Sequence, residues 1–151
     1  MEYPRILLAD DEPEMIRAVA QLLDGKFEIV ATVDNGQSLI EDASRLDPDL
    51  LVLDISMPVM NGIEAARHLK KLGSRAKVIF LTVHGDRDFI EAAFSAGALG
   101  YVLKPRLATD LLPAIREALQ GRTFVSAPIG MEEALKSGRP DPILEAARSN
   151  L

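Results

Sequence analysis

Leu50-Leu51-Val52-Leu53-Asp54, followed by the turn Ile55-Ser56-Met57-Pro58, is the most informative stretch of this chain. Four consecutive apolar residues without alternation are typical of a strand that is buried on both faces of a parallel sheet. A strand that ends in Asp54 places a carboxylate at the carboxyl edge of the sheet, where ligands bind in open α/β folds. Because an ionised carboxylate is costly to bury alone, we expect the rest of the chain to bring compensating groups to Asp54.

Length and composition narrow the possible functions. The chain has 151 residues, which suits one domain, a formal net charge of -6, and no cysteine. The sequence therefore excludes disulfides, thiolate metal sites and cysteine nucleophiles, and two histidines are too few for a histidine-rich zinc site. The acidic balance argues against nonspecific DNA binding by this chain. The N-terminus does not resemble a signal peptide and no apolar run is long enough to cross a membrane, so we expect a cytoplasmic protein.

Apolar runs alternate with amphipathic segments along about 120 residues, which predicts five strand–helix units. The expected strands are residues 6–9, 27–32, 50–53, 78–81 and 100–103, and the expected helices are residues 13–24, 37–45, 62–72, 87–96 and 109–119. Such alternation is typical of an α/β protein with a doubly wound parallel sheet and right-handed crossovers.

Four of the expected strands are followed directly by polar or charged residues, namely Asp10-Asp11, Asp54, Thr82 and Lys104. In a parallel sheet these four strand ends share one edge, so three carboxylates, a hydroxyl and an ammonium group would meet there. The carboxylates repel one another unless a cation or a proton compensates them, and oxygen ligands favour Mg²⁺. An aspartate beside Mg²⁺ can accept a phosphoryl group, with Lys104 and the Thr82 hydroxyl on its other oxygens.

From about Arg5 to Gly121 the chain resembles the receiver domain of two-component response regulators. The matching features are Asp10-Asp11, Leu53-Asp54 with Met57-Pro58 and Gly62 after it, Thr82, and Lys104-Pro105. The resemblance implies a flavodoxin-like (CheY-like) doubly wound (βα)5 parallel sheet in which the strands, numbered along the chain, lie in the order 2-1-3-4-5. Residues 1–121 are therefore expected to form the receiver domain, and residues 122–151 a C-terminal linker or tail with room for one or two short helices.

The resemblance also implies a role for each residue of the site. Asp54 is the phosphoacceptor, and Mg²⁺, with Mn²⁺ as a substitute, is held by Asp10, Asp11, Asp54 and the backbone carbonyl of Ser56. Thr82 and Lys104 contact the phosphoryl group, and the peptide bond before Pro105 is expected to be cis.

The same resemblance implies a conformational switch and a pair of residues that controls the rate of dephosphorylation. Thr82 and Tyr101 would repack the face made by residues 87–96, 100–103 and 109–119, although Tyr101 fits plain core packing equally well. Ser56 and His84 would tune dephosphorylation by controlling water access, although a loop histidine is more often inert.

Residues 97–104 and 121–126 are similar to the NarL/FixJ (LuxR-class) subfamily, whose receivers usually precede a helix-turn-helix domain. No room remains for that output domain before residue 151, so we expect either a regulator cut at its linker or a natural stand-alone receiver. Direct DNA binding by this chain is not expected.

The sequence thus predicts a signalling phosphoacceptor, not an enzyme, that catalyses only its own phosphorylation and dephosphorylation. One expected partner is a sensor histidine kinase or a phosphotransfer protein. The other is a second copy in a homodimer, or an output partner, on the face made by residues 87–96, 100–103 and 109–119.

One alternative is a pseudo-receiver that binds partners without phosphorylation. A second, a Mg²⁺-dependent aspartyl-phosphate phosphohydrolase, would need a general acid where Ser56 stands. A third, a flavin-binding module, is disfavoured because Asp10-Asp11-Glu12 would repel phosphate.

Overall fold

The structure, a computed structural model, describes residues 3–126 and contains one six-stranded parallel sheet. The strands lie in the order β2-β1-β3-β4-β5-β6, which confirms the predicted order of the first five. They span Arg5–Ala9 (β1), Glu28–Val33 (β2), Leu50–Leu53 (β3), Lys77–Thr82 (β4), Gly100–Leu103 (β5) and Phe124–Val125 (β6). The central position of β3, between β1 and β4, explains why its sequence is apolar throughout.

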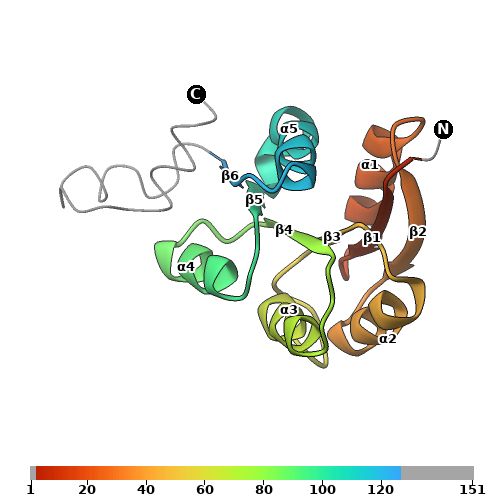
Figure 1. Cartoon of the computed structure of the whole chain (residues 1–151). Helices are drawn as coiled ribbons and strands as arrows, with labels where there is room; N and C mark the ends of the chain where they lie inside the picture. The colour runs from red at the N-terminus through yellow and green to blue at the C-terminus, as the bar shows by residue number, and fades with distance from the viewer. Residues whose placement is uncertain (1–2, 127–151) are drawn as a thin grey trace.

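Helices cover both faces of the sheet, with α1 and α5 on one face and α2, α3 and α4 on the other (Figure 1). The helices span Pro13–Leu23 (α1), Gly36–Leu46 (α2), Gly62–Lys71 (α3), Arg87–Ser95 (α4) and Leu107–Leu119 (α5), and a short 3-10 helix, η1, spans Lys104–Arg106. Every predicted helix and strand through α5 is present, with bounds within two residues of those expected.

Two apolar cores lie on either side of the sheet, and β3 contributes to both. Leu50 and Val52 pack towards α1 and α5, whereas Leu51 and Leu53 pack towards α2, α3 and α4. All four side chains are at most 3% exposed, so each contributes about 1.5–3 kcal/mol of burial free energy. The strand is therefore anchored rigidly, and the residue that follows it, Asp54, is held at a fixed place.

Two of the helices next to the carboxyl edge, α2 and α3, begin at side chains that cap them. The Asn35 side chain accepts a hydrogen bond from the backbone N–H of Ser38, and the Asn61 side chain accepts one from Glu64, each at 2.9 Å. Pro13 occupies the first position of α1, where its missing N–H costs nothing. These local signals fix where the loops around the strand ends give way to helix.

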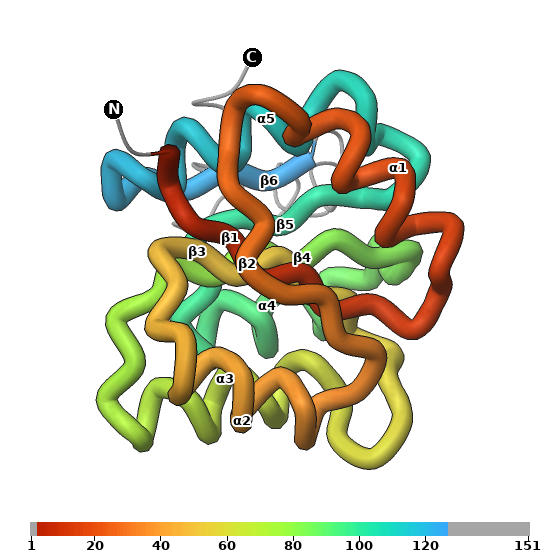
Figure 2. Tube along the Cα trace, turned by 90° about the vertical axis from the view of Figure 1, so that its right-hand side faces the viewer, coloured from red at the N-terminus to blue at the C-terminus, as the bar shows by residue number. Residues whose placement is uncertain are grey.

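A sixth strand, β6, lies in the segment that the sequence assigned to the C-terminal linker. It runs parallel beside β5 (Figures 1 and 2), with Gly100 opposite Phe124 and Tyr101 opposite Val125. The backbone N–H of Ser126 then donates to the carbonyl of Tyr101 at 2.9 Å. Residues 127–151, where short helices were predicted, lie outside the described part of the chain, and the domain boundary at residue 121 stays a prediction.

Within residues 3–126, no helix is both long enough and apolar enough to span a membrane.

Candidate functional site

The carboxyl ends of four neighbouring strands carry buried polar side chains. Asp10 follows β1, Asp54 follows β3, Thr82 ends β4 and Lys104 follows β5, and their exposed fractions are 6%, 4%, 0% and 8%. Since polar groups are seldom buried without partners, this concentration at one edge marks the candidate site. The structure thus brings together the strand-end residues that the sequence singled out.

Lys104 is the hub of the site. Its Nζ lies 3.0 Å from Asp10 Oδ2, 3.1 Å from Asp54 Oδ2 and 3.0 Å from Glu12 Oε1. Burial opposes the charge on Lys104, but its hydrogen bonds to Glu12, Asp10 and Asp54 outweigh burial and raise its pKa above the usual range. The ammonium group is therefore charged at neutral pH and partly compensates the buried carboxylates.

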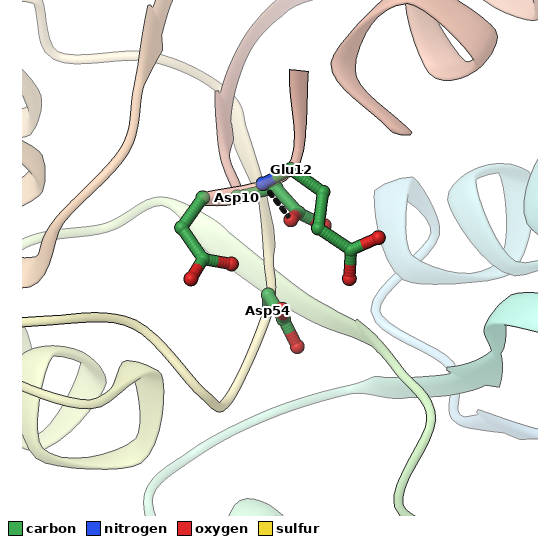
Figure 3. A group of neighbouring side chains, drawn as sticks. Asp10, Glu12 and Asp54 are labelled. Atoms are coloured by element: carbon green, nitrogen blue, oxygen red, sulfur yellow. Dashed lines mark hydrogen bonds between the residues drawn. The ribbon is translucent and has the colours of Figure 1, made fainter. Parts of the chain in front are cut away.

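Asp10 shows that this compensation is incomplete. Burial raises the pKa of Asp10, and the nearby charge of Asp54 raises it further. The backbone N–H of Glu12, which donates to Asp10 Oδ1 at 2.9 Å (Figure 3, dashed line), and the Lys104 ammonium group act in the opposite direction without cancelling the rise. The raised pKa of Asp10 thus comes mainly from burial and to a smaller extent from the neighbouring Asp54 charge, and a bound cation would oppose both effects.

The acidic residues fit a divalent metal ion. Asp10, Asp11, Glu12 and Asp54 each offer one carboxylate oxygen, and these oxygens lie within 4.8 Å of one another. Figure 3 shows Asp10, Glu12 and Asp54 gathered around a common space. A set of oxygen ligands with two exposed members suits Mg²⁺, which keeps part of its water shell. Glu12 was not among the metal ligands predicted from the sequence, although its place directly after the acidic pair was a usable signal.

Ser56 and His84 form the rim of the site. Ser56 Oγ and His84 Nε2 are 2.7 Å apart, which joins the loop after β3 to the loop after β4. The His84 ring also stacks on Phe89, with 4.5 Å between the ring centroids and 24° between the planes. His84 is therefore held on two sides and is not a free loop histidine.

Tyr101 is fully buried and connected to the same rim. Its hydroxyl donates to the backbone carbonyl of His84 at 2.6 Å, and the His84 N–H donates to Thr82 Oγ1 at 3.4 Å. Burial raises the pKa of Tyr101, and Asp86 and Asp54 raise it further, so the phenol stays a hydrogen-bond donor. Tyr101 therefore packs in the core and also contacts the loop that follows Thr82, and its role as a switch stays a prediction.

Pro105 lies in η1 directly after Lys104, and the cis isomer of the peptide bond before it stays a prediction.

A groove of about 550 Å³ opens beside Asp10 and Asp11 and is lined by residues of α1, β2 and α2. The acidic pair Asp10-Asp11 is therefore reachable from the surface on this side.

Comparisons with known proteins agree with this geometry. Residues 6–116 match the family described as the response regulator receiver domain. The nitrate/nitrite response regulator NarL of Escherichia coli is 36% identical over 127 residues, covering 83% of this chain and 59% of the relative. The chemotaxis protein CheY of Halobacterium salinarum is 35% identical over 115 residues, covering 76% and 96%.

A solved structure, a two-component response regulator of the LuxR family from an Aurantimonas species, superimposes with a TM-score of 0.82 at 30% identity. The superposition covers 91% of this chain and 100% of the other. The similarity to NarL and to LuxR-family regulators agrees with the subfamily resemblance in the sequence. The chain spans 52% to 62% of the length of the first curated transcriptional regulators that it matches.

Proposed function

Because the chain belongs to the response regulator receiver domain family, we propose that Asp54 accepts a phosphoryl group from a phosphohistidine in a Mg²⁺-dependent reaction. The donor is a sensor histidine kinase or a phosphotransfer protein. The observation that carries this proposal is the contact of 3.1 Å between Lys104 Nζ and Asp54 Oδ2 inside a buried acidic cluster. Such a contact keeps a positive charge beside the oxygen that would attack phosphorus.

Each residue of the site has a part in this reaction. A carboxylate oxygen of Asp54 forms the new O–P bond as the N–P bond of the donor breaks and the imidazole leaves. Lys104 offers charge, and Thr82 offers a hydroxyl donor, to the oxygens of the transferring group. Asp10, Asp11 and the backbone carbonyl of Ser56 would hold Mg²⁺ together with Asp54, and Mn²⁺ is an acceptable substitute. The metal, when bound, supplies further positive charge against those oxygens.

Signalling would then use the connection from Thr82 through His84 to Tyr101. Movement of Thr82 towards the phosphoryl group would shift the loop whose His84 carbonyl accepts the hydrogen bond from the Tyr101 hydroxyl. This shift would bias the conformation of the face formed by α4, β5 and α5. That face is the proposed contact for a second copy, a partner or an output domain. The Ser56–His84 pair would limit the access of water and so set the rate of dephosphorylation.

The test is intact mass spectrometry after incubation with acetyl phosphate and Mg²⁺. We expect one phosphoryl adduct on the unmodified chain and on Asp24→Asn, an exposed carboxylate outside the site, but none on Asp54→Asn or without Mg²⁺. An equal adduct on Asp54→Asn would contradict the proposal. Absence of both an adduct and Mg²⁺ binding would instead favour the pseudo-receiver alternative.

A further inference from the structure

Asp110 in α5 and Ser126 after β6 are the two buried polar residues of the described chain that lie outside the candidate site. They are 6% and 0% exposed, and Ser126 Oγ donates to Asp110 Oδ2 at 2.7 Å. A buried carboxylate and hydroxyl are costly unless hydrogen bonds compensate them, so their other partners indicate what the pair holds in place.

Ser126 holds the strand that leads into Lys104. The backbone N–H of Leu103 donates to Ser126 Oγ at 3.2 Å, and the N–H of Ser126 donates to the carbonyl of Tyr101 at 2.9 Å. The hydroxyl therefore contacts the backbone of the residue immediately before Lys104, while it is itself held by Asp110.

Asp110 holds the chain that leaves Lys104. Its carboxylate accepts hydrogen bonds from Arg106 Nε at 2.8 Å and from Thr109 Oγ1 at 3.0 Å. Arg106 ends η1, the turn that begins at Lys104. The Asp110–Ser126 pair thus contacts the chain one residue before Lys104 and two residues after it.

We propose that Asp110 and Ser126 form a brace that positions Lys104 for phosphoryl transfer to Asp54. This inference rests on the proposed function. Lys104 carries a point charge on a flexible four-carbon stem, so the place of its ammonium group depends on how firmly its backbone is fixed. Groups that orient a functional side chain from behind commonly matter nearly as much as the side chain itself. Ser126, which lies beyond the predicted domain boundary, would thereby belong to the working receiver.

The test compares Ser126→Ala and Asp110→Asn in the full chain with the unmodified protein. Binding of beryllofluoride, a phosphoryl mimic, is measured by titration calorimetry in the presence of Mg²⁺, and Mg²⁺ binding is measured alone. We expect each variant to bind beryllofluoride about tenfold more weakly, as for other outer partners of functional groups. Mg²⁺ affinity should not weaken, because the carboxylates that would hold the metal are untouched.

Two further measurements separate positioning from stability. Amide exchange at Leu103 should accelerate in Ser126→Ala, because its acceptor is gone, and Ser126→Thr, which keeps the hydroxyl, should restore beryllofluoride binding. Ile115→Val removes a buried methyl group from α5 without touching the brace. Glu117→Gln changes another residue of α5 and weakens its ion pair with Arg122, which follows the helix. Both controls should bind beryllofluoride like the unmodified chain.

The outcomes are distinguishable at a temperature where circular dichroism shows every variant to be folded. Equal beryllofluoride affinity in the brace variants and in Ile115→Val overturns the brace and leaves the proposed function standing. Absence of beryllofluoride binding by the unmodified chain overturns the proposed function and the brace with it. Because Asp110→Asn preserves side-chain volume, it decides the question even where Ser126→Ala fails to fold.

Discussion

Val59 is the residue with the clearest backbone strain in the described chain. It lies in the loop between β3 and α3 with φ of 71°, and its side chain is 82% exposed. The left-handed region costs a non-glycine residue about 1–2 kcal/mol, and a β-branched side chain adapts to it poorly. The loop beside the phosphoacceptor therefore stores strain that no burial of Val59 offsets.

We expect Val59→Gly to raise the free energy of unfolding by about 1 kcal/mol, because glycine removes the strain but gains freedom in the unfolded chain. Urea denaturation followed by circular dichroism measures the change. Val83→Gly is the matched control, since Val83 is also exposed, at 63%, but has no positive φ. A midpoint for Val59→Gly that is no higher than that of the unmodified chain would contradict the strain argument.

Asp110 makes the stability of the fold depend on pH. Burial opposes its charge, but hydrogen bonds from Arg106, Ser126 and Thr109 prevail and hold the pKa of Asp110 below its ordinary value of 3.8. A carboxyl group with a lowered pKa in the folded state stabilises the protein above the unfolded pKa, and this contribution is lost as the pH falls through the folded pKa.

We therefore expect Asp110→Asn to lower the free energy of unfolding by about 1 kcal/mol at pH 7, a modest value because Arg106 is partly exposed to solvent. The difference should shrink as the pH falls below 3.8. Urea denaturation at neutral and acidic pH measures it, with Asp24→Asn, a change at an exposed carboxylate, as the control. A difference that does not change with pH would count against the charged role of Asp110.

Site residues were predictable from the sequence where each directly follows a predicted strand. Asp54 and Lys104 each come immediately after an apolar strand, so the parallel sheet alone brings them to one edge. Asp110 and Ser126 were not predictable, because they are separated by 16 residues and meet only through the pairing of β6 with β5. No local pattern encodes that register.

The start of α3 is the element most tightly fitted to the site. The N–H of Gly62 donates to the carbonyl of Ile55 at 2.8 Å, and a methyl group on Gly62 would overlap the backbone carbonyl oxygen of Asp54. The glycine is thus required by the close approach of the helix to the phosphoacceptor backbone. Helix α3 cannot move away without opening the core formed by Ile63 and Ala66.

We expect Gly62→Ala to lower the free energy of unfolding by about 3 kcal/mol, at the upper end of overpacking effects, and to reduce phosphoryl adduct formation on Asp54. Gly85→Ala is the control, because its new methyl group would meet Leu103 at 3.8 Å, an ordinary contact. Urea denaturation and intact mass report the two effects. Equal stability of Gly62→Ala and Gly85→Ala would show that the loop relaxes freely.

Helices and strands differ in how well they can be predicted from the sequence. Three helix starts have local sequence signals, because Pro13 suits the first helical position and Asn35 and Asn61 are capping residues. Helix α5 begins at Leu107, two residues earlier than expected, because η1 leads directly into it. Strand β6 has two residues, too few for a periodic pattern, and its formation depends on the exposed edge of β5.

The whole molecule carries a net charge of -6 and gathers four carboxylates in one cluster, three of which lie within 3.1 Å of the Lys104 ammonium group. The alternation of strands and helices predicted a doubly wound parallel sheet, and the resemblance to receiver domains predicted the order of its first five strands. The charge balance of the site was less predictable. The place of Glu12 after Asp10-Asp11 was a signal for the acidic cluster, but its contact with Lys104 depends on the geometry of the loop after β1. The folded chain therefore has an unmet preference for a cation that the unfolded chain lacks.

We expect Mg²⁺ to raise the free energy of unfolding in proportion to RT ln(1 + [Mg²⁺]/Kd), or about 2.7 kcal/mol at a concentration of 100 Kd. Thermal unfolding across a Mg²⁺ titration, against KCl at matched ionic strength, measures this effect. Asp11→Asn removes an exposed carboxylate of the cluster, so it should weaken the response to Mg²⁺ while slightly stabilising the metal-free fold by relieving repulsion. Asp24→Asn should leave the response unchanged. If KCl raised the unfolding temperature as much as Mg²⁺, the acidic cluster would be a screened surface charge and not a metal site, and the proposed phosphoryl chemistry at Asp54 would lose its cation.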